Sequence, residues 1–392
     1  MAAIFSGFAA LLPIVSVVAP KGTVALLLLA AALTVWTYWW ANRRIPVPDL
    51  RIAIALALFV AWCAIASAWS VDTARSLGLV LRITVILAAG MVLFPVAAAL
   101  DEAARREIGR WLVVGLGLGL AFVAVETGLD YPVLRLFKTA EPGKEAVWFN
   151  HGAIAVAMIV WPATAYLWKG RLGWKALFVP VLLGTASLIL ESASATLGFA
   201  AGVAVVLLAV IHRKAGRTIT IAATLLAFVA MPFVALELHN HGWHRADWLP
   251  ASAQHRVEIW DFSVQRIAEK PLLGWGFDGS RHMGSLFPAP SDTGRDIAAL
   301  HPHSAPLQIM LELGAVGAVI ALAFLWLIVM RLDRVSDHTR MFGQAQFVAT
   351  LAIGSVSHGA WQNWWLALVV SAALMIPLTA EPSEPKDAME TN

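Results

Sequence analysis

The chain contains about twelve apolar runs that are long enough, or nearly long enough, to form helices across a membrane. A spanning helix needs about 20 predominantly apolar residues. The runs are continuous and do not alternate with polar residues, so they indicate helices and not the strands of a membrane barrel. We therefore predict an all-α polytopic membrane protein with about 12 transmembrane helices. The predicted spans are residues 4–19, 23–40, 51–69, 78–99, 111–126, 151–168, 176–191, 196–212, 218–236, 305–330, 343–358 and 361–379.

Composition excludes most other classes of protein. Hydrophobic residues make up 59% of the chain and charged residues only 14%, against about 45–50% and about 25% in soluble domains. A soluble enzyme, a secreted mini-protein and a disordered scaffold are therefore excluded. The single cysteine, Cys63, permits neither a disulfide framework nor a cysteine-rich metal site. A net charge of +3 is too small to indicate nucleic acid, so we expect membrane lipids as the surroundings and no nucleic acid as a partner.

Lysine and arginine accumulate in alternate short loops, and this asymmetry predicts the orientation of the chain. The opposite short connections hold little beyond Lys21 and Arg75. Positive residues favour the cytoplasmic side, so we expect both termini in the cytoplasm. The basic loops carry Arg43, Arg44 and Arg51; Arg105, Arg106 and Arg110; Lys169, Arg171 and Lys175; Arg213, Lys214 and Arg217; and Arg331, Arg334 and Arg340.

Four regions follow from this reading. Residues 1–236 hold the first nine spans, residues 237–304 form a large loop with short helices, residues 305–380 hold the last three spans, and residues 381–392 are a disordered cytoplasmic tail. The large loop is expected to face the periplasm of a Gram-negative cell. A loop of this length in a compact protein is usually functional. It contains seven of the eleven histidines, namely His239, His241, His244, His255, His282, His301 and His303.

The large loop contains one segment with helical periodicity, residues 253–270. We expect Ser252 to cap this helix and Pro271 to end it, with Arg256 in its first turn. Its apolar face is predicted to comprise Val257, Trp260, Val264 and Ile267.

A glycine-containing turn follows, in which Gly274 and Gly276 are expected to let backbone amides approach a ligand. Arg281 comes next along the chain, and residues 301–304 then lead into the tenth span.

The chain resembles the O-antigen ligase and polymerase family in an ordered set of motifs: Arg256-x-x-x-Trp260, Pro271-Leu-Leu-Gly-Trp-Gly276, and His301-Pro-His303-Ser304 with Gly314 beyond it. The resemblance implies a bacterial inner-membrane glycosyltransferase with its active site facing the periplasm. It would move a glycan from undecaprenyl pyrophosphate to an acceptor hydroxyl, with no cofactor and no metal. The acceptor is lipid A–core for a ligase and another lipid-linked repeat for a polymerase.

The resemblance also implies roles for single residues. His303 would be the general base, and Arg256 would hold the donor pyrophosphate. An imidazole can take the proton of a hydroxyl as it attacks, and arginine offers a bidentate fork to phosphate. His301 is a second catalytic candidate, although it could only orient the turn. For His303 an ordinary interfacial anchor is the alternative, and for Arg256 a salt bridge with Glu258 or Asp261.

One position departs from the family pattern. Ala195 stands where members commonly carry a phosphate-binding arginine. Another cation would then be needed, and we expect Arg82, about one turn inside the membrane, or else Arg281. An arginine at that depth usually has a partner, for which Glu191 and Glu312 are candidates.

Two alternative functions stay open from the sequence, while the arginine–histidine set argues against a third, a non-catalytic membrane scaffold. The chain could be a repeat-unit polymerase for O-antigen or exopolysaccharide, which shares these motifs. It could be a transporter of a lipid-linked glycan, although no internal repeat typical of transporters is evident. Finally, His239, His241 and His244 could bind zinc, although a solvated loop is the favoured reading because no carboxylate or cysteine stands at matching spacing.

Overall fold

A computed structural model describes residues 1–136, 149–212, 215–287 and 301–379, so the predicted tail lies outside the described residues. Across these ranges the regular structure is helical, without strands. The longer helices are α1 (Ala2–Val18), α2 (Gly22–Asn42), α3 (Leu50–Ala66), α4 (Thr73–Ala98), α5 (Glu102–Gly128), α6 (Asn150–Leu167), α7 (Phe178–Ile189), α8 (Ala193–Ile211), α9 (Ala215–Asn240), α10 (Ala251–Glu269), α12 (Ala305–Leu332), α13 (Asp337–Val356) and α14 (Asn363–Thr379). A single turn, α11 (Met283–Leu286), lies in the large loop.

Each predicted apolar segment coincides with one of these helices, α1–α9 or α12–α14. Among the described residues, eight helical stretches are long and apolar enough to cross a membrane. One of them, Asn150–Leu188, contains α6 and all but the last residue of α7. Two shorter apolar helices, α1 and α14, have 17 residues each. An all-α architecture with several helices able to cross a membrane is thus confirmed. The number of twelve spans stays a prediction.

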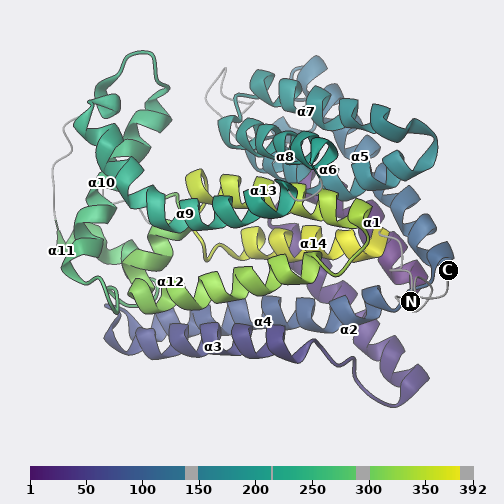
Figure 1. Ribbon diagram of the computed structural model, residues 1–392, viewed down its shortest axis with the longest axis horizontal. Helices are drawn as coiled ribbons and strands as arrows, with labels where there is room; N and C mark the ends of the chain where they lie inside the picture. Colours follow the sequence, from purple (N-terminus) through teal and green to yellow (C-terminus); the bar gives the residue numbers. More distant parts are fainter. Residues whose placement is uncertain (137–148, 213–214, 288–300, 380–392) are drawn as a thin grey trace.

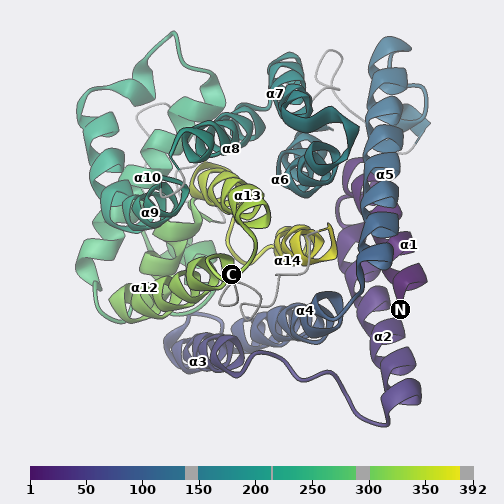
Figure 2. The same ribbon diagram turned by 45° about the vertical axis from the view of Figure 1, so that its right-hand side comes forward.

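Helices α3, α4, α9, α12 and α13 run lengthwise between two ends of the molecule, whereas α2 and α5 are steeply inclined to them (Figure 1 and Figure 2). The end that carries the basic loops is joined by three ion pairs: Arg331–Asp49 at 3.6 Å, Arg217–Asp333 at 3.1 Å and Lys169–Glu102 at 3.7 Å. The large loop lies at the other end, where α10 and α11 are drawn, opposite the N-terminus. The arrangement therefore separates the basic loops from the histidine-rich loop, and the compartments that they face stay predictions.

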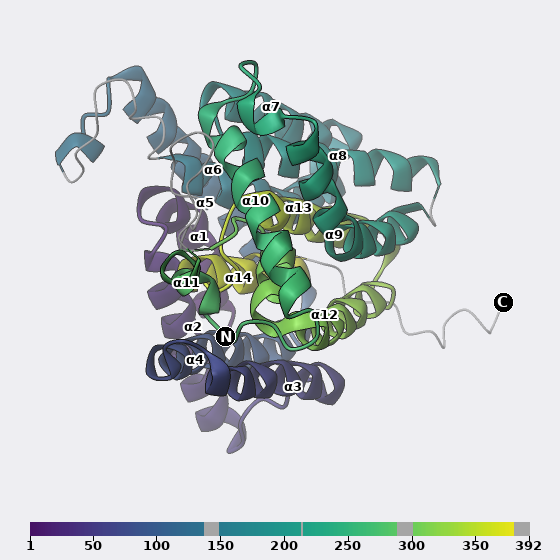
Figure 3. The same ribbon diagram turned by 90° about the vertical axis from the view of Figure 1, so that its left-hand side faces the viewer.

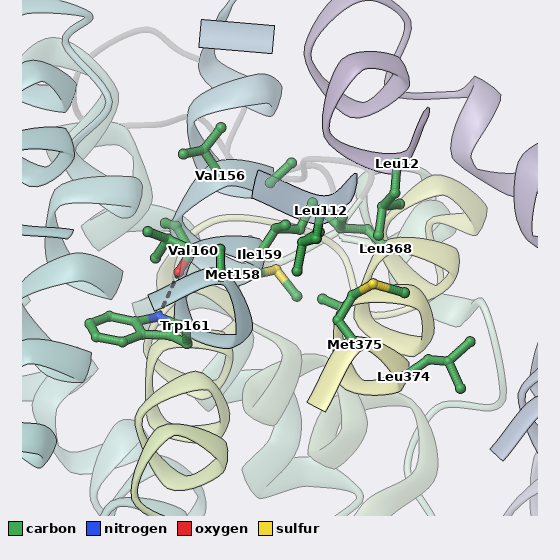
Figure 4. Packing of buried hydrophobic residues seen from close by; sticks show 14 of the residues in the cluster. Leu12, Leu112, Val156, Met158, Ile159, Val160, Trp161, Leu368, Leu374 and Met375 are labelled. Atoms are coloured by element: carbon green, nitrogen blue, oxygen red, sulfur yellow. Dashed lines mark hydrogen bonds between the residues drawn. The ribbon is translucent and has the colours of Figure 1, made fainter. Parts of the chain in front are cut away.

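Helix α6 occupies the centre of the largest buried cluster, with α5, α7, α8, α13 and α14 around it (Figure 2). Every residue from Gly152 to Ala165 is buried, as expected for a helix that is apolar on all sides. Figure 4 shows Trp161 at this centre, where its Nε1 donates to the carbonyl of Ala157 at 2.8 Å. The tight packing fixes the start of α6, at the end where the large loop lies.

Helix α10 confirms the predicted periodicity, and its apolar face packs against α9 and α12. Figure 3 shows it in front of the ends of these helices. The predicted cap is wrong: the residue before the helix is Pro250, which provides no side-chain cap, and Ser252 lies inside the first turn. The helix ends at Glu269, two residues before Pro271, as expected.

Candidate active site

His303 is held in an unusual backbone conformation at the entrance to α12. Its φ is +53°, in the left-handed region that non-glycine residues rarely adopt. Its Nδ1 lies 2.9 Å from the carbonyl oxygen of Ser357, in the connection between α13 and α14. Because a carbonyl oxygen only accepts, Nδ1 carries the proton, and Nε2 of a neutral ring is left as an acceptor. This is the tautomer that a general base requires.

Trp260 attaches α10 to the histidine segment. Its indole Nε1 donates to the carbonyl oxygen of Pro302, which lies between His301 and His303, at 2.9 Å. Arg256 precedes Trp260 by four residues, so both side chains project from the same face of α10. The spacing of the arginine and the tryptophan therefore brings Arg256 to the histidines, and its charge helps to lower the pKa of His303.

Arg256 has no ion pair with a carboxylate among the described residues, so the predicted alternative of a bridge to Glu258 or Asp261 is wrong. Burial lowers the pKa of its guanidinium below the usual value, although an arginine remains protonated near neutral pH. Burial also lowers the pKa of His303, and Arg256 adds to this effect, while the bond to the Ser357 carbonyl opposes it. The result is a neutral imidazole beside a partly buried cation that has no ion pair with a carboxylate of the described chain.

His301 is more constrained than His303. Its Nδ1 faces the backbone N–H of His303 at 3.2 Å, and its Nε2 faces Nε2 of Gln362 at 2.9 Å. The indole of Trp364 donates to Oε1 of Gln362, which fixes the amide so that its nitrogen points at His301. Burial, His303 and Arg281 lower the pKa of His301 to about 4. A neutral imidazole has one acceptor nitrogen, and Nδ1 of His301 already accepts from the N–H of His303, so His301 is suited to orienting the segment and not to accepting a proton.

Two further histidines join this cluster, and the sequence reasoning missed both. His151, at the start of α6, stacks on His358 with ring centroids 5.4 Å apart and an interplanar angle of 15°. Trp364 packs edge-on against both rings. The positive-inside pattern contained a signal for them, since it places the start of the sixth span and the end of the eleventh on the same face as the large loop.

Arg281 lies near His301 and belongs to an ionic group with Asp278 and Arg75. The Asp278 carboxylate is buried and lies 2.9 Å from Nε of Arg75 and 3.5 Å from Nε of Arg281. Two arginines thus share the Asp278 carboxylate, and the Glu312 carboxylate lies on the other side of the same turn, where it accepts from the backbone N–H of Asp278. The charge of Arg281 is also close enough to lower the pKa of His301.

The glycine turn has a structural role, and our expectation that its amides approach a ligand is wrong. The N–H groups of Trp275 and Gly276 donate to the carbonyls of Leu311 and Glu312 at 2.9 and 3.0 Å. These carbonyls lie just before Gly314, where α12 is broken at φ +64° and ψ −165°. A Cβ on Gly314 would lie 2.2 Å from the carbonyl oxygen of Leu272. The turn and the break therefore fit into each other, and this close approach requires glycine.

Two predicted positions lie apart from the cluster. Arg82 is exposed on α4, and no ion pair joins it to a described carboxylate. The expected partner Glu312 instead accepts from Asp278, Ser280, Gln308 and Trp361. Ala195 is fully buried in the main cluster, in the first turn of α8. Of the two cations considered as substitutes for the family arginine, Arg281 is thus nearer to the histidines.

The histidine group in the loop after α9 is only partly solvated. His241 is exposed, but His244 is 5% exposed and stacks on His239 with centroids 4.2 Å apart. His239 also lies 3.6 Å from the Asp261 carboxylate. The favoured reading of a solvated loop is therefore wrong for His244. Among the described residues no group of three or more ligands has the arrangement of a metal site.

These features define a multi-pass, all-α membrane protein with a histidine–arginine site at one end of its helices. Residues 178–322 match the family model described as O-antigen ligase. Relatives from Rickettsia bellii (strain RML369-C) and Rickettsia felis (strain ATCC VR-1525 / URRWXCal2), both named "Putative polysaccharide ligase", are 25% and 23% identical over 331 residues. These alignments cover 83% of this chain and 79% and 80% of the relatives. The chain is thus similar to the O-antigen ligase family over residues 178–322, which confirms the resemblance seen in the motifs.

Proposed function

We propose that this protein transfers a glycan from undecaprenyl pyrophosphate to a hydroxyl of lipid A–core at the periplasmic face of the bacterial inner membrane. The observation that carries the proposal is the pairing of His303 with Arg256. A neutral imidazole with a free acceptor nitrogen lies beside a half-buried guanidinium that has no carboxylate partner in the described chain. A base and an anion-binding cation are the two groups that this transfer requires.

In the proposed reaction, Nε2 of His303 takes the proton of the acceptor hydroxyl. The acceptor oxygen forms a bond to the anomeric carbon of the glycan, and the bond from that carbon to the pyrophosphate oxygen breaks. Undecaprenyl pyrophosphate leaves with the electron pair, and the imidazolium of His303 then releases its proton to solvent. The hydrogen bond from Nδ1 to Ser357 stabilises the imidazolium as it forms.

Two arginines are proposed to bind the donor pyrophosphate. Arg256 reaches the site from α10, and Arg281 from the loop that precedes α11. Fixed cations stabilise the negative charge that develops on the leaving group, and they act most strongly where water is scarce. The role of Arg82 stays a prediction. Comparison of Arg82→Ala with Arg281→Ala shows which of the two arginines is the second cation that binds the pyrophosphate. The larger loss of donor affinity is expected for Arg281→Ala.

The proposal is tested by reconstitution of the purified protein with a lipid-linked glycan and either lipid A–core or a second lipid-linked repeat. Gel analysis should show glycan joined to lipid A–core, at a rate that depends on His303. Longer lipid-linked glycan in place of that product would favour the polymerase alternative. Movement of the donor across the bilayer without any new glycosidic bond would refute glycan transfer and favour a transporter.

The proposed orientation has its own test. Reporter fusions in the 237–304 loop and at the C-terminus should report opposite compartments, with the loop in the periplasm. If both fusions report the same compartment, the proposed placement of the active site is refuted.

A further inference from the structure

We propose that Glu312 is a positioning residue that sets two parts of the site at once, namely Arg281 and the connection 357–362 that holds the histidines. The inference rests on the proposed function of those groups. Glu312 touches neither histidine, and it lies in α12 two residues before the break at Gly314.

The Glu312 carboxylate is fully buried, and each of its oxygens accepts two hydrogen bonds. Oε1 accepts from the Ser280 hydroxyl at 2.6 Å and from Nε2 of Gln308 at 2.8 Å. Oε2 accepts from the backbone N–H of Asp278 at 2.7 Å and from the indole Nε1 of Trp361 at 2.6 Å. Four donors from three separate segments therefore converge on one side chain, more than its position inside α12 requires.

Two of the donors lie in the loop that carries Arg281. Asp278 and Ser280 both donate to Glu312 and directly precede Arg281. Asp278 has φ +58°, in the left-handed region, so this tight turn depends on outside support. Its carboxylate in turn lies 3.5 Å from Nε of Arg281. Loss of the Ser280 bond should therefore loosen Arg281 and weaken donor binding.

The other two donors, Gln308 and Trp361, connect Glu312 to the part of the chain that holds the histidines. Trp361 donates directly to Glu312, while Gln308 donates to Glu312 and accepts from the backbone N–H of Ala360 at 2.8 Å. Both contacts fix the connection 357–362. In that connection, the carbonyl oxygen of Ser357 binds Nδ1 of His303, and the side-chain amide of Gln362 contacts His301. Loss of the Trp361 bond should therefore affect the base and not the donor.

The contacts of Glu312 toward Arg281 (the Arg281 arm) and its contacts toward the histidines (the histidine arm) predict different kinetic effects. This difference separates a positioning role from a general role in folding. Ser280→Ala removes one donor from the Arg281 arm and should raise the donor KM about 3- to 10-fold with little change in kcat. Trp361→Phe keeps a ring against Phe277, whose centroid lies 5.0 Å away, but removes the indole N–H. It should lower kcat about 3- to 10-fold with little change in the donor KM.

Glu312→Gln is the combined variant, because an amide nitrogen would face two donors in place of an acceptor. It should change KM and kcat together. Glu126→Gln is the matched control: Glu126 is equally buried and accepts from the N–H groups of Val133 and Leu134 at 2.9 and 2.8 Å. This control should leave both constants unchanged. Each variant is purified in detergent, and its thermal unfolding is compared with the wild type.

The reference variants Arg281→Ala and His303→Ala separate failure of the inference from failure of the proposed function. If Arg281→Ala changes the donor KM and His303→Ala changes kcat, but Ser280→Ala and Trp361→Phe alter the same constant or neither, the positioning role is refuted. If Arg281→Ala and His303→Ala themselves have no effect, the proposed function fails, and the inference falls with it.

Discussion

Replacement of Arg256 tests the proposed site most directly. Arg256→Lys keeps a positive charge but loses the planar fork that binds a phosphate through two parallel hydrogen bonds. A hydrogen bond to a charged group contributes about 1.5–3 kcal/mol, and about 1.4 kcal/mol corresponds to tenfold in rate. Loss of one such bond should therefore lower kcat/KM about 10- to 150-fold. Arg256→Met should do more harm, because it also removes the charge.

The same structure predicts that the protein stays folded. Arg256 has no ion pair with a described carboxylate, so Arg256→Met leaves no buried acid without its partner. A partly desolvated cation that no described carboxylate compensates lowers stability, so its removal should be neutral or stabilising. The midpoint of thermal unfolding in detergent should therefore be unchanged or higher, while transfer is lost. Arg266→Lys is the control on the same helix, because Arg266 already pairs with Glu269 at 2.9 Å, and its transfer rate should match the wild type.

The assay is glycan transfer in proteoliposomes, with donor binding measured separately by titration of lipid-linked glycan. The expected result is a loss of donor affinity in Arg256→Lys with the Arg266→Lys control unaffected. Full activity of Arg256→Lys would mean that a point charge suffices and would refute bidentate binding of the phosphate by Arg256. A marked fall in the unfolding midpoint of Arg256→Met would show that Arg256 serves the fold.

Three further outcomes are expected. His303→Ala should lower kcat about 10²- to 10⁴-fold and His301→Ala less, as measured by transfer rates; equal losses would contradict the assignment of the base. Gly314→Ala should destabilise the protein, because its φ is +64° and a Cβ would clash with the Leu272 carbonyl; an unchanged unfolding midpoint would contradict this. Finally, the acid limb of kcat/KM should lie below pH 6.5, because the pKa of His303 is lowered and the base must be neutral. Removal of the nearby charge in Arg256→Met should move that limb to higher pH. A shift to lower pH would contradict the placement of Arg256 close to His303.

The sequence by itself determined the properties that depend on local composition and periodicity. Continuous apolar runs predicted the positions of the helices, because each span must satisfy its own backbone in lipid. The spacing of Val257, Trp260, Val264 and Ile267 predicted α10 to within two residues at its start. The motifs also singled out His303 and Arg256, which the fold brings together through the bond from Trp260 to Pro302.

Only the tertiary structure decided which helix ends meet. His151 and His358 lie far apart in the sequence, and neither is part of a recognisable motif, yet helix packing stacks their rings. The same packing leaves Arg82 exposed on α4 and brings the charge of Arg281 close to His301. Hydropathy indicates how deep a residue lies but not which way it points around its helix, because that rotation is set by the neighbours against which the helix packs.

The glycine turn and the buried carboxylate show the same division. From the sequence, Gly274 and Gly276 predicted a tight turn, and Glu312 was a candidate partner of Arg82. What each group binds is a matter of contacts between segments: the turn's amides meet carbonyls of α12, and the carboxylate collects donors from α12, the large loop and the connection before α14. Such contacts are not encoded by any local pattern, since they arise only when separate segments come within hydrogen-bond distance.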